Sequence, residues 1–444
     1  MMDMLVFLQT VNRICALPAT VLFFGSAIFI SFLTSFPQFF AFHRLKRIVS
    51  KLYSDDTEQP LKEGKVKTKK TIAPLHALYA AMGTTIGVGN IVGPALAIFS
   101  GGPGALFWLL VYIFFGSVIK YAEVVFAIKT RIISKDGNVI GGPMEYLKLV
   151  SPILAISYTY AMIPLFIGWS SVQANTLASF LSMYYVPSWI VGATVAGLVV
   201  LVLRGGAERV GLVASYVVPL MFIGYVGSIL IILVRNIDAS MQAFMLMGRC
   251  IFSPAAPLGG FAGASVFYAM RSGVYRSIFI SEAGLGTSAI THAVADVKDP
   301  VDQGVLALYS MGSDALLSFL SGMLVLSTGV WTYGDFRSTL IYEAFLHHAS
   351  WIGQLILFIT VFLFVITTVI GNSFNGLQSF SSITNHKQKT FYTTCTALAI
   401  LAGSVARAQM IWELMDVVLT VVALFNLLGL VWLVYHHRSF LRID

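Results

Sequence analysis

The chain has 444 residues, of which 57% are apolar and 11% are charged, and its formal net charge is +8. Soluble globular chains carry about 25% charged residues, so this composition argues against a water-soluble enzyme and against a nucleic-acid-binding protein. A polytopic membrane protein fits both values, because its basic residues gather in cytoplasmic loops. We therefore expect an all-α membrane protein whose partner is the lipid bilayer and not a nucleic acid.

Apolar stretches long enough to cross a bilayer follow one another along the chain. About 20 apolar residues span the hydrocarbon core, and the pattern predicts eleven transmembrane helices. They cover about residues 15–41, 74–99, 104–129, 152–181, 187–203, 210–234, 259–282, 305–330, 351–373, 391–409 and 412–436. The segment 43–72, between the first two helices, is polar and rich in lysine.

The distribution of Lys and Arg predicts the orientation of these helices. With the N-terminus outside and the C-terminus in the cytoplasm, most of the 28 Lys and Arg residues are cytoplasmic, as the positive-inside rule requires. The basic residues left on the outer side are Arg13, Arg235, Arg249, Arg337 and Arg407. The predicted location is the plasma membrane.

Eleven helices divide into one extra helix and two groups of five. The extra helix and its basic loop occupy 1–73, the first group occupies 74–235, and the second group with a short cytoplasmic tail occupies 236–444. Two successive groups of five have opposite orientations in the membrane. That arrangement is typical of an inverted-repeat transporter, in which the first helix of each repeat is broken.

Glycines interrupt the predicted helix that leads the first group. They are Gly83, Gly87, Gly89 and Gly93, and Pro94 follows at once. Each glycine costs about 1 kcal/mol relative to alanine inside a helix, so we expect unwound backbone over 87–90. Its amides, at the positive end of the following half-helix, are suited to a carboxylate, and its carbonyls to a small cation. The alternative is a glycine-lined face for helix packing.

The interrupted stretch is also part of a family pattern. The run Gly-Thr-Thr-Ile-Gly-Val-Gly-Asn-Ile-Val-Gly at 83–93 is followed in order by motifs at 101–105, 107–108, 120–123, 141–144, 173–176, 205–206, 282–286 and 303–304. Together they resemble the alanine or glycine:cation symporter family. The resemblance implies the leucine-transporter-type fold of the amino acid-polyamine-organocation superfamily. It also implies symport of a small neutral amino acid, such as alanine (L or D) or glycine, with Na⁺ or, alternatively, H⁺.

The helix that leads the second group carries glycines as well. Gly259, Gly260 and Gly263 open it, and Gly273 lies further along. The resemblance implies an unwound stretch at 263–265 that faces the first one across the substrate. Arg271 and Arg276 then lie in the cytoplasmic half, either as gate residues or reaching to the interface. Glu282, at the cytoplasmic mouth, is a candidate partner for one of them.

The resemblance also assigns ligand contacts. Those for the substrate are Val88, Gly89, Asn90, Gln173, Gly263 and Asn372. Those for Na⁺ are the hydroxyls of Thr367 and Thr368 and the backbone carbonyls of Gly83, Ile86 and Phe364. Oxygen donors of this kind suit a hard cation.

Other polar residues within the spans have two interpretations each. Lys120 and Glu123, three residues apart on one helix, predict a structural ion pair near the inner side, or else a proton relay. Asn175 either contributes to the site or forms a hydrogen bond between helices. Asp314 either couples ion movement or pairs structurally.

The chain departs from the family pattern at two points of the substrate pocket. Val88 replaces the usual threonine, and Asn372 begins a segment that is usually rich in aromatic residues. These changes leave the predicted ion site intact but alter the pocket for the substrate side chain. Alanine or glycine remains the expectation, with a larger or more polar neutral amino acid as the alternative.

Two other classes of protein remain as alternatives. A channel would need a continuous polar pore, usually formed by oligomerisation, whereas the symporter interpretation requires no oligomer. A membrane-embedded enzyme would need a nucleophile and base that face each other inside the spans. His292, His347 and His348 are predicted to lie in loops, so the sequence predicts no enzymatic activity.

Overall fold

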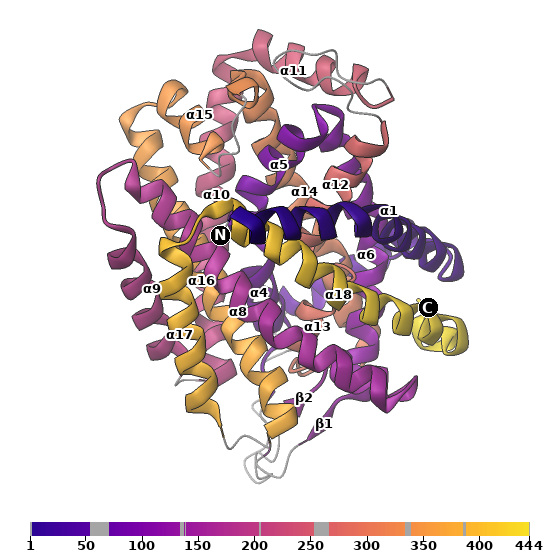
Figure 1. The fold of residues 1–444 in the computed structure, drawn as a ribbon. Coiled ribbons are helices and arrows are strands. Elements are labelled where there is room, and N and C mark those ends of the chain that lie inside the picture. Colours follow the sequence, from indigo (N-terminus) through magenta and orange to yellow (C-terminus); the bar gives the residue numbers. More distant parts are fainter. Residues whose placement is uncertain are drawn as a thin grey trace.

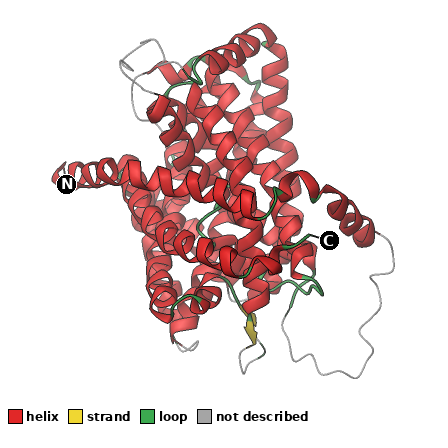
Figure 2. Cartoon of the chain, turned by 90° about the vertical axis from the view of Figure 1, so that its right-hand side faces the viewer, coloured by secondary structure: helices red, strands yellow, loops and turns green. Residues whose placement is uncertain are grey.

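The computed structural model describes residues 2–53, 71–133, 137, 139–203, 206–252, 266–333, 339–384 and 388–443. These residues form a bundle of helices with one short antiparallel hairpin, β1 (Ile132–Ile133) with β2 (Val139–Ile140). Figure 1 shows α11 (Ile237–Arg249) and α15 (Leu340–His348) at the end of the bundle opposite to the hairpin. Figure 2 shows the hairpin projecting from the other end.

Eight helical segments within these ranges are long and apolar enough to cross a membrane. They comprise α1 (Met2–Leu33), the pair α4 (Pro74–Thr85) and α5 (Val88–Gly101), α6 (Gly104–Thr130), α8 (Pro152–Ser182), α10 (Gly206–Arg235), α14 (Pro300–Thr328), α16 (Trp351–Thr384) and α18 (Ala408–His436). Three shorter helices match further predicted spans: α9 (Ser188–Leu203), α12 (Val266–Ser281) and α17 (Lys389–Val405). The multi-pass helical architecture is confirmed, whereas the total of eleven spans stays a prediction.

Short helices connect or extend these segments. They are α2 (Pro37–Phe40), α3 (Phe42–Tyr53), α7 (Pro143–Tyr146) and α13 (Thr287–His292), with 3₁₀ turns at Leu147–Leu149, Val330–Tyr333 and Arg438–Leu441. Proline begins α4, α8 and α14, where its missing N–H group leaves no helical hydrogen bond unmade. The first helix ends at Leu33, earlier than predicted, because Ser35 and Phe36 adopt left-handed conformations that a helix cannot continue.

The helix that leads the first group is interrupted inside the bundle. Ile86 (φ −78°, ψ 96°) and Gly87 (φ −151°, ψ −161°) separate α4 from α5 and are both extended. Unwound backbone was expected over 87–90, but Val88 to Asn90 form the first turn of α5. The unwound part is therefore shorter than expected, and it is followed at once by the amides of a helix N-terminus.

A second interruption lies at 282–286, between α12 and α13. The φ angles of Glu282, Gly284 and Gly286 are 61°, 97° and 74°. Positive φ angles cost the two glycines little. Glu282 was expected at the cytoplasmic mouth, and the structure shows its side chain fully buried. The unwound stretch expected at 263–265 lies outside the described residues.

The two interrupted helices cross each other in opposite directions. α5 packs against α12, and α4 packs against α13, so the two interruptions lie between the paired halves. Of the eight long segments, α4–α5 is the most enclosed, with 89% of its apolar window buried. Interrupted backbone is tolerated at membrane depth only where protein or a cavity encloses it. The fold therefore brings two interruptions together in its interior, where a polar ligand can be held.

Candidate functional site

The amides freed by the first interruption bind side chains from two helices. The Gly87 N–H donates to Asn90 Oδ1 (3.1 Å), and the Val88 N–H donates to Gln173 Oε1 on α8 (3.2 Å). Val88 and Asn90 are fully buried, and Gln173 is 2% exposed. These donors lie at the positive end of α5, where an anion is stabilised. Gln173 thus contacts the position at which a carboxylate would be bound.

The five oxygen donors expected for Na⁺ lie on two facing helices, α4 with its end at Ile86 and α16. Thr368 Oγ1 donates to the Ile86 carbonyl (3.2 Å), and Thr367 Oγ1 donates to the Phe364 carbonyl (3.2 Å). A Cβ atom built on Gly83 would lie 3.8 Å from Thr367 Cβ, so α4 approaches α16 closely there. Three carbonyls and two hydroxyls are the donor chemistry of a hard monovalent cation, and these residues fit Na⁺.

The expected substrate contacts that remain differ in their surroundings. A Cβ atom on Gly89 would lie 3.2 Å from the Phe279 ring, so Gly89 faces α12. Asn372, one helical turn beyond Thr368, is fully buried, and neither its Oδ1 nor its Nδ2 has a hydrogen-bond partner among the described residues. A buried amide without partners indicates a bound water or a ligand group. Gly263 lies outside the described residues.

An aromatic layer that sequence reasoning missed covers the site on the side of α5 and α12. The Phe279 ring contacts the rings of Trp169 (centroids 5.3 Å apart) and Trp412 (4.7 Å). The Arg276 guanidinium lies over the Trp412 ring (5.1 Å) and pairs with Asp416 on α18 (2.5 Å). The side chains of this ion pair are only 14% and 13% exposed. Aromatic rings and an enclosed ion pair therefore close this end of the bundle.

The positions expected for the two arginines of α12 are wrong. With the interruption at 282–286, Arg271 and Arg276 lie in the half-helix that packs against α5, away from α4. On the topology predicted from charge, this is the outer half and not the cytoplasmic one. Arg276 pairs with Asp416 and not with Glu282.

Two charged residues of α6 bind the second interruption. Lys120 Nζ donates to the Ser281 carbonyl (3.1 Å). Glu123 Oε1 accepts hydrogen bonds from the Gly284 N–H (3.1 Å) and from Asn426 Nδ2 (2.7 Å). The expected Lys120–Glu123 ion pair is wrong, because each residue instead satisfies polar groups around the break, which would otherwise remain unpaired at membrane depth.

Two further carboxylates lie between the interruptions. Asp314 Oδ1 accepts from Asn90 Nδ2 (3.1 Å), and Glu282 accepts from the Thr287 hydroxyl. The second oxygen of each carboxylate is buried and has no hydrogen-bond partner among the described residues. A buried carboxylate oxygen without a partner is costly when charged, so a cation or a proton is expected to bind there.

Other polar residues named from the sequence have structural contacts. Asn175 Nδ2 donates to the carbonyls of Gly403 and Ala406 (2.8 Å each), so it joins α8 to the end of α17. His292 is fully buried at the end of α13 and bonds Gln303, so its expected placement in a loop is wrong. The expected loop placement of His347 and His348 is also wrong, because they form the last turn of α15.

Comparison with known proteins decides the family. A family model described as "Sodium:alanine symporter family" matches residues 1–442. The chain belongs to this family. The Sodium/alanine symporter AgcS of Methanococcus maripaludis is 30% identical over 97% of this chain and 95% of its own length. Membership makes the chain a multi-pass membrane transporter and not an enzyme, and it assigns the chain to cation-coupled amino acid symport.

Two further matches bear on the substrate and the fold. The Probable sodium/glutamine symporter GlnT of Bacillus subtilis is 28% identical over 91% of this chain and 85% of its own. The solved structure of MhsT in complex with L-phenylalanine superposes with a TM-score of 0.62 over 82% of this chain and 89% of that chain, at 12% identity. The similarity to MhsT supports the fold alone, which is the leucine-transporter-type fold.

Proposed function

We propose that this sodium:alanine symporter family member carries a small neutral amino acid together with Na⁺ by alternating access. The observation that supports this most is the interruption at Ile86 and Gly87. It leaves amides and carbonyls inside the bundle next to Thr368, Gln173 and Asn372. A channel would instead need a continuous polar pore, whereas here buried residues surround the candidate site.

Na⁺ is proposed to join the two helices that carry its donors. The donors are the carbonyls of Gly83, Ile86 and Phe364 and the hydroxyls of Thr367 and Thr368. The Thr368 hydroxyl donates to the Ile86 carbonyl. When Na⁺ binds, both oxygens turn toward the cation, and the end of α4 is fixed to α16. This fixing prepares the first turn of α5 for the substrate.

The substrate carboxylate is proposed to bind the amides of Val88 and Gly89. It would take the place of the Gln173 carbonyl oxygen, which accepts from the Val88 N–H. Gln173 and Asn90 then orient the ammonium group, together with backbone carbonyls of the second interrupted helix, for which Gly263 was the expected residue. Alanine (L or D) or glycine is the substrate class that we favour.

A more polar neutral amino acid is the alternative substrate, and Asn372 favours it. Its amide is buried without partners, so it can bond a polar side chain of the substrate. GlnT is named as a probable sodium/glutamine symporter, and it is similar to this chain over most of its length. Glutamine is therefore the competitor to test against alanine.

Alternating access is proposed to follow from the two interrupted helices. With the N-terminus outside and the C-terminus cytoplasmic in the plasma membrane, the helix of 1–73 lies beside two inverted groups, 74–235 and 236–444. Halves α5 and α12 close the outer end, and halves α4 and α13 close the inner end. One chain carries the whole site, so no oligomer is required.

The ion pair of the outer closure gives a first test of this cycle. Arg276→Gln and Asp416→Asn are each expected to lower the uptake rate at saturating substrate about tenfold or more. Removing one partner of an enclosed pair leaves an unpaired charge, at a cost of about 3–5 kcal/mol. The uptake rate of the double variant should be no lower than that of either single variant. As a control, Lys389→Gln removes a charge from an exposed position that has no carboxylate partner among the described residues, and it should change the rate less than twofold. Losses that multiply in the double variant would contradict a shared role.

H⁺ is the alternative coupling ion, because buried carboxylates near the interruptions could bind a proton. Three buried carboxylates lie around the interruptions, those of Glu123, Glu282 and Asp314. The buried cation near them is Lys120. A proton on Asp314 or Glu282 would neutralise a charge in the interior as a bound cation would.

Uptake into proteoliposomes tests the proposed function and separates the two ions. The purified chain is reconstituted, and labelled L-alanine is offered with an inward Na⁺ gradient, a pH gradient, or neither. We expect accumulation above the outside concentration with Na⁺ alone, and its collapse with a Na⁺ ionophore. Accumulation that follows the pH gradient without Na⁺ would show that H⁺, and not Na⁺, is the coupling ion. No accumulation of alanine, glycine or glutamine under either gradient would refute the symport proposal.

A further inference from the structure

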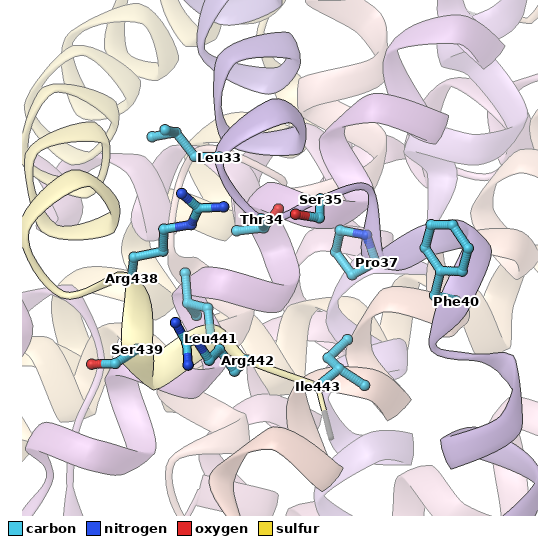
Figure 3. Close-up of a pocket in the computed structure, with 10 residues that line it drawn as sticks. All are labelled: Leu33, Thr34, Ser35, Pro37, Phe40, Arg438, Ser439, Leu441, Arg442 and Ile443. Atoms are coloured by element: carbon cyan, nitrogen blue, oxygen red, sulfur yellow. The ribbon is translucent and has the colours of Figure 1, made fainter.

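A cavity of about 510 Å³ lies between the end of α1 and the C-terminal segment that follows α18. Thr34 and Ser35, in the turn between α1 and α2, line one wall, while Arg438, Ser439 and Arg442 line the other (Figure 3). The Arg438 side chain extends toward Thr34 in this view. Two cations and several hydroxyl groups therefore converge on one space, far from the interruptions in the bundle interior.

The cavity lies at the level where lipid headgroups are expected. α1 and α18 pack side by side, and at their other ends the Asn12 side chain donates to the Glu413 carboxylate (2.6 Å). The C-terminal segment beside the cavity contacts the end of α6, because Lys129 Nζ lies over the Phe440 ring (5.0 Å) and α6 ends at Thr130. On the topology predicted from charge, this is the cytoplasmic end of α6, where lipid headgroups are expected.

Exposed aromatic side chains lie on the chain segments that lead to the cavity, and one of them lines it. Phe32 and Tyr435 are each 65% exposed, and Phe40, which lines the cavity, is 73% exposed. Aromatic residues collect at the boundary between hydrocarbon and headgroups. The cavity thus opens where acyl chains pass alongside and where phosphate groups lie within reach of the arginines.

The two arginines of the cavity can be compared with the two arginines that form ion pairs. Arg44 pairs with Asp299 and Asp302, and Arg276 pairs with Asp416. Arg438 and Arg442 have no carboxylate partner among the described residues. Two guanidinium groups that line one cavity repel each other and attract an anion.

We propose that this cavity binds the phosphate headgroup of an anionic phospholipid, in the inner leaflet on the topology predicted from charge. Guanidinium groups form paired hydrogen bonds with phosphate oxygens, and Ser35 and Ser439 add hydroxyl donors. Leu33 and Phe40 contact the apolar part of the lipid next to the headgroup. The bound lipid fastens the first helix to the C-terminal segment. This proposal is independent of the transported solute.

Native mass spectrometry of the full chain in detergent tests the site, with phosphatidylglycerol as the probe. The double substitution Arg438→Gln/Arg442→Gln is expected to weaken lipid binding about tenfold or more, because it removes both charge-assisted contacts. The matched control Lys389→Gln/Arg407→Gln removes the same charge from exposed positions elsewhere, and it should change binding less than twofold. If the double variant does not remain monodisperse, Arg442→Gln alone should weaken binding at least threefold.

Competitors distinguish the sources of the phosphate group. Phosphatidylcholine at the same concentration should bind more weakly than phosphatidylglycerol, and inorganic phosphate should not displace the lipid. Wild-type binding by the variants would overturn the proposal, as would equal binding of phosphatidylcholine. Displacement by inorganic phosphate would show a site for a free anion and would overturn the assignment to lipid.

Discussion

Thr368→Val is expected to raise the Na⁺ concentration for half-maximal uptake about tenfold or more. The substitution keeps the shape of the side chain and removes one of the five proposed oxygen donors, the hydroxyl that now bonds the Ile86 carbonyl (3.2 Å). A hydrogen bond or contact to a charged group contributes about 1.5–3 kcal/mol, and 1.4 kcal/mol corresponds to a tenfold change. At saturating Na⁺, the apparent constant for alanine should change less than threefold. Uptake rates measured over a Na⁺ series at fixed alanine provide the test.

A buried threonine elsewhere supplies the control for this substitution. The Thr396 hydroxyl is fully buried on α17 and donates to the Tyr392 carbonyl of its own helix (2.9 Å). Thr396→Val should therefore leave the Na⁺ dependence unchanged while it imposes the same chemical change. If Thr368→Val kept the wild-type Na⁺ dependence in active protein, the ion would not bind between α4 and α16.

Gly89→Leu is expected to abolish substrate binding, with a loss of at least about a hundredfold in affinity. A Cβ atom at this position would already lie 3.2 Å from the Phe279 ring and 3.7 Å from the Ile280 Cα atom. A leucine side chain must therefore turn over the first-turn amides of α5 and cover the proposed carboxylate position. Binding of labelled alanine to the purified variant, in the presence of Na⁺, measures the effect.

Two other glycine substitutions serve as controls for Gly89→Leu. Gly197→Leu places the same side chain on α9, where nothing lies within 4 Å of the new Cβ atom, and it should bind alanine as the wild type does. Gly89→Ala adds only the Cβ atom against the Phe279 ring and should have an intermediate affinity. Retained alanine binding by Gly89→Leu would mean that this glycine serves helix packing and not the substrate.

The first interruption could be located from the sequence to within a few residues. Four glycines within an otherwise apolar span weaken the helix, and the family motif covers the same positions. Gly83, Gly89 and Gly93 nevertheless lie in helices, so the glycines mark the region of the break and not its residue. The extent of the unwound part could not be predicted. Asn90 and Gln173 bond the amides at Gly87 and Val88, and these contacts let α5 begin directly after Gly87.

The second interruption could not be located in the same way. Glycines lie before and inside the predicted span 259–282 as well as at Gly284 and Gly286, and composition does not show which of them adopt positive φ. The break at 284–286 depends on bonds from Glu123 and Asn426, residues distant in the sequence. Sequence reasoning therefore did not identify 282–286 as an interruption inside the bundle, and it placed the arginines of α12 in the other half.

The closure of the outer end depends on contacts that no local pattern reveals. Arg276 and Asp416 are 140 residues apart in the chain, and Trp169, Phe279 and Trp412 come from three helices. The three aromatic residues look, in the sequence, like ordinary residues of apolar spans, and Arg276 could be named as a possible gate residue but not paired with Asp416. Only the packing of α8, α12 and α18 brings them together above the site.

The central claim is that the interruption at Ile86 and Gly87 holds both solutes. A density map of the full chain in lipid nanodiscs, compared with and without Na⁺ and alanine, tests it most directly. We expect alanine density at the amides of Val88 and Gly89, and an ion between the Ile86 carbonyl and the Thr368 hydroxyl, both absent from the ligand-free map. An uninterrupted helix from Pro74 to Gly101, with alanine bound elsewhere or not at all, would contradict the account.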